Sequence, residues 1–176
     1  ILFKHFNEAI ALLEVVIHIS VEKLDKFHPT YANALNTLAG VYNETGRYEE
    51  AEHKYKEALE IRKHALGSNS LIYSSSLSNL AGLYKDTGRY KEAISLFIEA
   101  NEINIQQFNE NFIYLSEIEK QHFLKTLYFN FDVFYSFTID YVDKDNKILQ
   151  AFQNLIYSTK GIILDSVTKM KKNILK

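Results

Sequence analysis

The chain has 176 residues, a formal net charge of −2, 47% hydrophobic residues and no cysteine. This length allows one domain or a short repeat array, and the hydrophobic fraction is large enough for a continuous core. The near-neutral charge argues against a protein that binds nucleic acid directly or an anionic membrane. Without cysteines, the segment has no disulfide, cysteine zinc site or cysteine nucleophile, and a reducing, cytoplasmic location is expected.

Residues 1–26 are predicted to form one amphipathic helix. Phe6, Ala9, Leu13 and Val16 follow the spacing of one helical face. The same spacing returns in the second helix of each repeat described below. The chain begins at Ile1 in the middle of this pattern. We therefore expect residues 1–26 to be the second helix of a truncated repeat, in a fragment of a longer protein with further repeats before it.

A close internal repeat follows. Residues 35–51 recur as residues 77–93 with an offset of 42, and 11 of the 17 positions are identical. A repeat of this length indicates an array of stacked units. Residues 27–68 and residues 69–110 are predicted to be two complete units. Each first helix has large and small apolar residues on one face, at Leu35, Leu38, Ala39 and Tyr42 and at Leu77, Leu80, Ala81 and Tyr84.

Each unit is predicted to be a helical hairpin. Thr45-Gly46 and Thr87-Gly88 end the first helices, because glycine suits the left-handed residue just past a helix end. Pro29 and Ser70 are suited to the start of a first helix. The second helices have matching apolar positions at Tyr48, Ala51, Tyr55 and Ala58 and at Tyr90, Ala93, Phe97 and Ala100.

The repeat ends near Phe108. Leu124, Thr126 and Asn130 stand where a third copy would have glycine, tyrosine and glycine. The pattern of residues 111–176 is still helical, with predicted helices at about 116–142 and 147–173 that form a connector or capping hairpin. The predicted fold class is all-α, a right-handed superhelical array of antiparallel helical hairpins ending in a longer hairpin.

The repeat resembles the tetratricopeptide repeat (TPR). Both units match the family pattern of a large apolar residue, Leu, a small residue, Tyr, Gly, Tyr, Ala, an aromatic residue and Ala. Two features differ: the period is 42 rather than 34, and Ile105 stands in place of the closing proline. The longer repeat is similar to those of kinesin light chains and many bacterial signalling proteins.

The tail has a resemblance of its own. Leu115-Ser-Glu-Ile-Glu-Lys120, the aromatic-rich helix after it and Lys160-Gly161 are similar to the connector that precedes the caspase-like CHAT domain in bacterial TPR-CHAT proteins. The resemblance covers residues 115–166. It implies a protease domain beyond Lys176, whose catalytic histidine and cysteine have no counterpart in this chain.

The resemblance to TPR proteins also implies where a partner binds, since their first helices line a concave groove. Asparagine and serine can hydrogen-bond a peptide backbone, and glycine lets that backbone approach closely; plain solvent-facing polarity is the alternative. The predicted groove residues are Asn33, Asn36, Gly40, Asn43, Glu44, Ser75, Ser78, Gly82, Lys85 and Asp86.

No pattern predicts catalysis, a metal or a cofactor in this segment. The six histidines lack a metal-binding arrangement, and the carboxylates of residues 49–60 lie among lysines and arginines, as intrahelical ion pairs do. The lysines of residues 160–176 favour a solvated helix end over a nucleic-acid contact. We expect a non-enzymatic module that binds a protein or peptide segment and is coupled to a downstream domain. A scaffold without an enzyme, or the sensor of a CRISPR-associated TPR-CHAT defence complex, remains an alternative.

Overall fold

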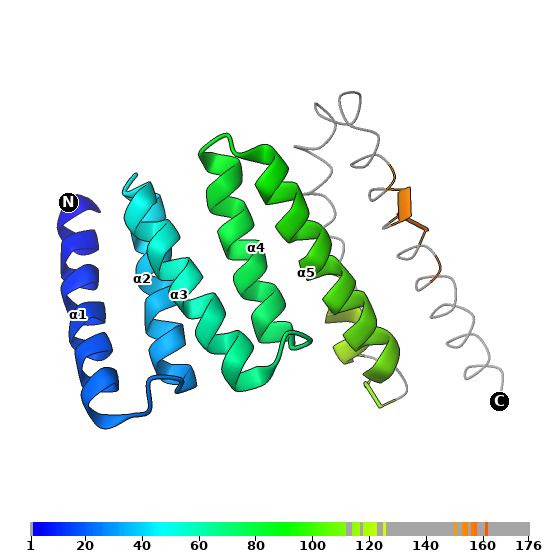
Figure 1. Ribbon diagram of the computed structural model, residues 1–176, viewed down its shortest axis with the longest axis horizontal. Helices are drawn as coiled ribbons and strands as arrows, with labels where there is room; N and C mark the ends of the chain where they lie inside the picture. Colours follow the sequence, from blue (N-terminus) through cyan, green and yellow to red (C-terminus); the bar gives the residue numbers. More distant parts are fainter. Residues whose placement is uncertain are drawn as a thin grey trace. The chain divides into compact units, whose positions relative to one another are not determined.

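The computed structural model describes residues 2–111, 114–116, 118–122, 125, 150, 153–154, 156–157 and 161. Five helices follow one another along the chain (Figure 1), namely α1 (Leu2–Lys23), α2 (Pro29–Glu44), α3 (Tyr48–Leu66), α4 (Leu71–Asp86) and α5 (Tyr90–Asn111). All regular structure of the described residues is helical, which confirms the all-α fold class. The chain forms two compact units, residues 1–96 and residues 97–176.

The first helices begin where the sequence predicts. α2 has Pro29 as its first residue, and the His28 side chain before it accepts a hydrogen bond from the Thr30 amide at 3.2 Å. In α4, the Ser70 hydroxyl accepts a hydrogen bond from the Tyr73 amide at 3.1 Å. Both contacts satisfy a backbone donor that the helix itself leaves unpaired.

The two hairpin turns have the same geometry. Gly46 and Gly88 both have φ of 76°, as a left-handed residue after a helix end requires. The amide of Arg47 donates to the carbonyl of Tyr42 at 2.8 Å, and that of Arg89 to Tyr84 at 2.7 Å. These bonds, with those of the two glycine amides to Asn43 and Lys85, form the Schellman motif that reverses the chain.

Each arginine of these turns also lies over the tyrosine that its amide binds. The guanidinium carbon of Arg47 is 4.0 Å from the centre of the Tyr42 ring, and that of Arg89 is 3.9 Å from the Tyr84 ring. A Schellman motif usually has an apolar contact between these two positions. Here a cation–π contact takes its place. This explains why the repeat retains both Tyr and Arg around its Thr-Gly pair.

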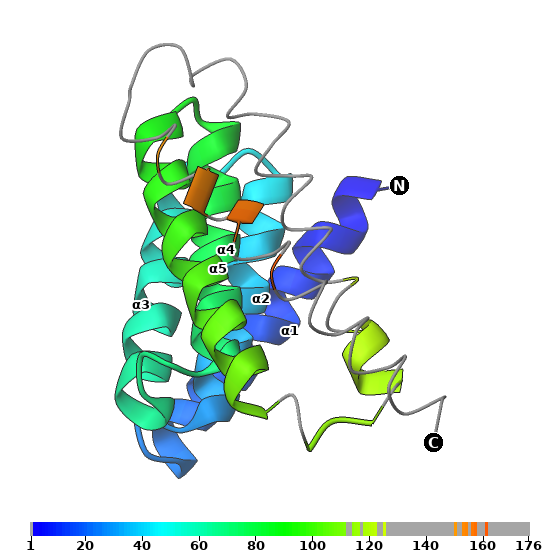
Figure 2. The same cartoon turned by 90° about the vertical axis from the view of Figure 1, so that its right-hand side faces the viewer.

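Within unit 1, α2 packs against α1 and α3, and α3 packs against α4. Figure 2 shows α3 to the left of α2, so the first and second helices of this hairpin lie on different sides of unit 1. Ala39 and Ala51, which the sequence predicts on the apolar faces of the two helices, are fully buried. A buried cluster of Ala32, Leu35, Ala58 and Ile61 fills the interior, with Ile17, Phe27 and Tyr31 packed against it.

Unit 2 is described mainly by the second part of α5 and the start of the tail. Phe97 and Phe108 are 4% and 2% exposed. Ser116 and Glu119 form a capping box, since the Glu119 amide donates to the Ser116 hydroxyl and the Ser116 amide to the Glu119 carboxylate. A helix therefore starts where the sequence predicts one. The rest of the predicted closing hairpin lies outside the described residues.

Candidate protein-interaction surface

The two first helices are linked side by side by polar side chains. The Asn79 amide donates to Asn36 Oδ1 at 3.0 Å, and the Asn43 amide donates to Asp86 Oδ2 at 3.2 Å. Each link joins residues that are 43 apart, one more than the repeat period. Residues of α2 therefore lie opposite α4 residues one place further along than their repeat equivalents. The repeat equivalent of Asn79 is Thr37, which is not among the predicted groove residues. For this reason the repeat pattern did not predict Asn79 for this surface.

The structure leaves all ten predicted groove residues accessible. Asn33, Glu44, Ser75 and Asp86 are exposed, and the other six are partly exposed. We call these ten residues together with Asn79 the α2–α4 face. Their role in binding stays a prediction.

The serines of this face are less available than predicted. The Ser75 hydroxyl donates to the Leu71 carbonyl at 2.9 Å, and the Ser78 hydroxyl donates to the Ser74 carbonyl at 3.2 Å. Both protons are therefore used within α4, as is common for serine in a helix. The hydroxyl oxygens can still accept a hydrogen bond. Asparagine, rather than serine, supplies the available donors.

The two helical glycines differ in their surroundings. A Cβ at Gly40 would lie 3.5 Å from the hydroxyl of Tyr55, whereas a Cβ at Gly82 would meet nothing within 4 Å. Tyr55 is 6% exposed, and its hydroxyl lies beneath the α2–α4 face. Burial, together with the negative charges of Glu44 and Asp86, raises the pKa of Tyr55. This side chain therefore stays neutral at physiological pH.

A buried arginine connects α2, α3 and α4 at the end of the α2–α4 face that lies away from the hairpin turns. Arg62 of α3 is 8% exposed and donates to Asn33 of α2 at 2.7 Å and to Ser76 of α4 at 2.5 Å. Its Nε has no hydrogen-bond partner among the described residues. Burial lowers the pKa of Arg62. The sequence holds a signal for this site, because the positions 42 residues away, Ser20 and Asn104, are also buried and polar.

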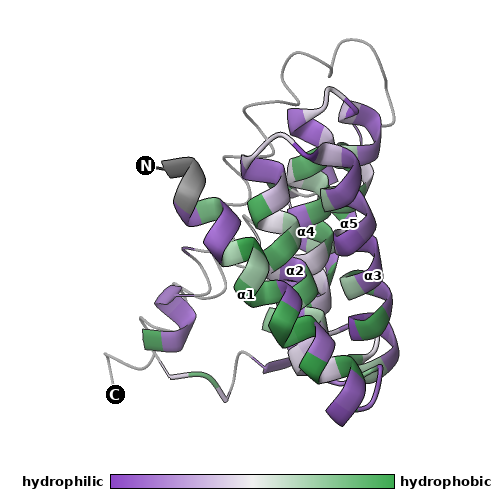
Figure 3. Cartoon of the chain, turned by 90° about the vertical axis from the view of Figure 1, so that its left-hand side faces the viewer, coloured by the Kyte–Doolittle hydropathy of each residue, from purple (hydrophilic) through white to green (hydrophobic). Residues whose placement is uncertain are grey.

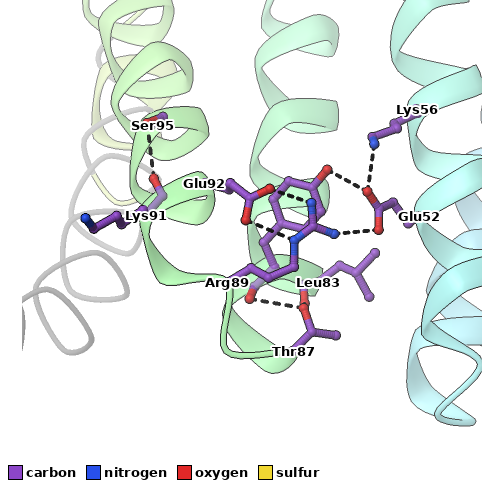
Figure 4. A network of polar contacts seen from close by, with 9 residues as sticks. Glu52, Lys56, Leu83, Thr87, Arg89, Lys91, Glu92 and Ser95 are labelled. Carbon is purple, nitrogen blue, oxygen red and sulfur yellow. Dashed lines mark hydrogen bonds and ion pairs between the residues drawn. The ribbon is translucent and has the colours of Figure 1, made fainter.

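A second polar network joins the two hairpins near their turns (Figure 4). The Glu52 carboxylate of α3 accepts hydrogen bonds from the hydroxyl of Tyr84 at 2.9 Å and from Arg89 at 2.6 Å, and pairs with Lys56 at 2.7 Å. Partial burial would raise the pKa of Glu52. The hydrogen bonds from Lys56, Tyr84 and Arg89 outweigh that effect and lower it to about 2. The carboxylate is charged at physiological pH and holds neighbouring hairpins together.

Among the residues that the structure describes, no group of three or more histidines, cysteines and carboxylates could hold a metal ion. None of the helices in the described part is both long and apolar enough to span a bilayer.

These features define a helical-hairpin repeat protein, in which two copies of one hairpin present their first helices on a common face. The model of the tetratricopeptide repeat family matches residues 3–63 and 30–106, which together make up more than half of the chain. The chain therefore belongs to the tetratricopeptide repeat family. Repeats of this family generally bind proteins or peptides. No curated protein matches the sequence.

Solved structures with a similar fold include kinesin-light-chain-type proteins. BtubC (BKLC) from P. vanneervenii has a TM-score of 0.64 and 22% identity, over 93% of this chain and 58% of BtubC. A kinesin light chain candidate of Podosopora anserina, with nearly identical TPR-like repeats, has a TM-score of 0.52 and 20% identity, over 92% of this chain and 88% of that protein. The chain thus spans little more than half the length of BtubC. At these identities, the similarity extends to the fold alone.

Proposed function

We propose that this chain is a protein-interaction module whose α2–α4 face binds an extended segment of a partner protein. The observation that supports this function is the Asn36–Asn79 pair. Asn36 uses its oxygen in this pair and Asn79 uses its nitrogen, which leaves the Asn36 amide as a donor and the Asn79 oxygen as an acceptor. Neither group has a further hydrogen-bond partner among the described residues.

One donor beside one acceptor complements the polar groups of a peptide bond, which has one N–H and one C=O. Such contacts bind a backbone without selecting its side chains, and pockets beside them supply specificity. Close approach of the bound backbone is possible at Gly82, where a missing Cβ leaves open space. The alternative from the sequence, a merely solvated face, would leave these groups bound to water.

The charged residues at the end of the α2–α4 face near the hairpin turns indicate which residue types a bound segment would carry there. Glu44 and Asp86 are exposed, and Lys85 lies 3.6 Å from Asp86 and neutralises part of its charge. Among the residues that the structure describes, no cation forms an ion pair with Glu44, so this end of the face is acidic on balance. A bound segment is therefore expected to place a basic or neutral residue near Glu44 rather than an acidic one.

Selection of a random peptide library against the 176-residue chain would test the proposal. Affinity of the selected peptide is then measured by fluorescence anisotropy for the wild type and for the double variant Asn36→Ala/Asn79→Ala. A loss of about tenfold or more is expected, because two hydrogen bonds of ordinary strength disappear. His53→Ala, an exposed change on α3, is the matched control. Equal affinity of the double variant and the wild type would contradict binding at this face.

The finer role proposed for the module is control of an effector that follows in the parent protein. The resemblance of residues 115–166 to a TPR-CHAT connector supports a caspase-like protease as that effector. The Ser116–Glu119 capping box provides a defined helix start within the resembling segment. The gene sequence beyond Lys176 tests this role. A His-Gly motif and a later cysteine in an α/β domain are expected, and their absence would contradict the protease.

The second candidate is a scaffold with no enzyme attached, favoured by the fold similarity to BtubC and to the kinesin light chain candidate. A sensor in a CRISPR-associated TPR-CHAT complex would instead bind a ribonucleoprotein through its protein part. The absence of cysteine supports a cytoplasmic setting for each of these roles. Affinity purification from the source cell separates them, since only the defence role recovers a guide RNA with the chain.

A further inference from the structure

The hydroxyl of Tyr55 has no hydrogen-bond partner in the part of the chain that the structure describes. Figure 3 shows mainly hydrophilic residues along α3, yet the Tyr55 side chain of this helix is only 6% exposed. Its oxygen reaches α2, since a Cβ at Gly40 would lie 3.5 Å from it. The fully buried atoms without a partner among the described residues are Asn43 Oδ1 and Arg62 Nε. The Tyr55 hydroxyl is therefore unpaired but still open to solvent beside Gly40.

This hydroxyl is a feature that the second repeat lacks. Phe97 stands at the place equivalent to Tyr55, and Gly82 at the place equivalent to Gly40. Phe97 is 4% exposed, so a ring at this position is buried equally well without a hydroxyl. Packing of the repeat therefore does not explain why Tyr55 carries a polar group. A contact with something that binds there would explain it.

Two carboxylates act on the Tyr55 hydroxyl. Glu44 lies one helical turn after Gly40, on the same face of α2. Asp86 of α4 accepts a hydrogen bond from the Asn43 amide at 3.2 Å. Burial raises the pKa of Tyr55, and the negative charges of Glu44 and Asp86 raise it further. The hydroxyl is consequently neutral, lies within the field of both carboxylates and can accept a hydrogen bond at its oxygen.

This end of the α2–α4 face has acceptors that lack donors. The Asp86 carboxylate takes the nitrogen of Asn43, so the Asn43 oxygen faces elsewhere and has no partner among the described residues. In the same part of the chain Glu44 forms no ion pair, and Asp86 pairs only with Lys85, at 3.6 Å. Two carboxylates beside one ammonium group leave a negative charge without compensation. A positively charged group that only donates hydrogen bonds complements such a site.

We propose that the Tyr55 hydroxyl, with Glu44 and Asp86 beside it, is a subsite for a lysine side chain of the bound segment. The inference rests on the function proposed for the α2–α4 face and specifies one residue of its ligand. A lysine ammonium has three N–H donors and no acceptor. One N–H meets the Tyr55 oxygen, and the positive charge lies between the two carboxylates. Gly40 leaves room for the narrow aliphatic stem, whereas arginine would bring a wider, planar group.

Two peptides that differ in one group test the subsite on the 176-residue chain. The probes are acetyl-Gly-Gly-Lys-Gly-Gly-amide and the same peptide with norleucine, which keeps the aliphatic stem but lacks the ammonium group. NMR titration of the ¹⁵N-labelled chain measures both dissociation constants. The lysine peptide is expected to bind at least about tenfold more tightly, and to shift the side-chain amide signal of Asn43. Equal binding, or no binding of either peptide at millimolar concentration, would overturn the proposal.

Conservative variants assign the effect to the subsite. Tyr55→Phe removes only the hydroxyl and is expected to fold normally, because phenylalanine is buried at the equivalent place of the second repeat. It should raise the dissociation constant of the lysine peptide about fivefold or more and leave that of the norleucine peptide unchanged. Glu44→Gln should weaken the lysine peptide several-fold and reduce its salt dependence. His53→Ala, the exposed control on α3, should match the wild type with both peptides. Wild-type affinity of Tyr55→Phe for the lysine peptide would also overturn the proposal.

The variant Asn36→Ala/Asn79→Ala separates this subsite from the proposed function. If the peptide selected from the library loses affinity in that variant but binds Tyr55→Phe as it binds the wild type, the face binds its partner without a lysine subsite. The inference then fails while the proposed function stands. If the double variant binds the selected peptide as the wild type does, and Tyr55→Phe still weakens the lysine probe, the subsite stands and the backbone contact at the asparagine pair fails.

Discussion

Glu52 of α3 accepts a hydrogen bond of 2.6 Å from Arg89, the residue that links α4 to α5. The contact joins the second helix of one hairpin to the turn of the next. Arg47 is the repeat equivalent of Arg89, but the position equivalent to Glu52 is Ile10, which has no carboxylate. The two turns therefore have the same internal hydrogen bonds. They differ in that the Arg89 turn is bonded to the second helix of the preceding hairpin, α3, whereas the Arg47 turn has no carboxylate at the equivalent place.

The first prediction concerns the pH dependence that Glu52 adds. A carboxyl group with a lowered pKa in the folded protein contributes stability above its unfolded pKa of about 4.5 and loses it as pH falls toward about 2. Glu52→Gln should lower the free energy of unfolding by about 1 kcal/mol at pH 7, since the carboxylate is partly screened by solvent. Urea titrations at pH 7 and at pH 3 measure it. A difference that does not shrink at pH 3 would assign the effect to packing instead of charge.

The second prediction compares the two turn arginines. Arg89 binds both Glu92 and Glu52, whereas Arg47 binds Glu50 within its own helix start. Arg89→Ala should therefore reduce stability more than Arg47→Ala, because it also breaks the contact between hairpins. Chemical denaturation midpoints of the two variants make the comparison. Equal midpoints would show that the Glu52 contact adds nothing to stability in solution.

The third prediction concerns the buried Arg62. Arg62→Ala should cost about 2–4 kcal/mol, because it removes a packed aliphatic stem and leaves the buried Ser76 hydroxyl without its donor. Arg62→Lys should cost less, although one ammonium group cannot reach both Asn33 and Ser76 with the same geometry. Thermal unfolding measures both variants. The exposed neighbour change Lys63→Ala, expected to stay within about 0.5 kcal/mol, is the control.

The fourth prediction separates two glycines of the second repeat. Gly88 has φ of 76°, so Gly88→Ala forces a left-handed alanine and should cost about 1 kcal/mol. Gly82 lies inside α4 with open space around its Cα, so Gly82→Ala should stabilise the chain by up to about 1 kcal/mol. Calorimetric midpoints test the opposite signs. If a bound peptide backbone approaches Gly82 closely, Gly82→Ala should also weaken peptide binding, because the added Cβ would occupy the space of that backbone. The same change would then stabilise the fold and reduce binding.

Local features of the fold were predictable because they depend on few neighbouring residues. The Thr-Gly turns, the cap at Ser70 and the helix start at Ser116 each involve residues within five positions of one another. The burial of Ala39 and Ala51 followed from the repeat itself, because equal spacing in two copies indicates a shared packing surface. The predicted face was also found accessible, although its binding role remains a prediction.

Contacts between hairpins were not predictable from the repeat. Matching at an offset of 42 paired Asn36 with Ser78, whereas the structure pairs it with Asn79. Arg62 is one of the arginines that the sequence pattern assigns to intrahelical ion pairs of α3, yet it is buried and bonded to two other helices. Which residues meet across a hairpin boundary depends on how far one hairpin is shifted and rotated relative to the next. The repeat period of 42 residues gives neither this shift nor this rotation directly.

The sequence by itself determined the five helices of residues 2–111, their turns and the family, because helix caps, left-handed glycines and apolar spacing act over one or two helical turns. Only the tertiary structure decided the one-residue shift between α2 and α4 and the partners of Glu52 and Arg62. The physical reason is that long polar side chains can satisfy their hydrogen bonds in many ways. Packing of whole helices selects which of these arrangements is formed.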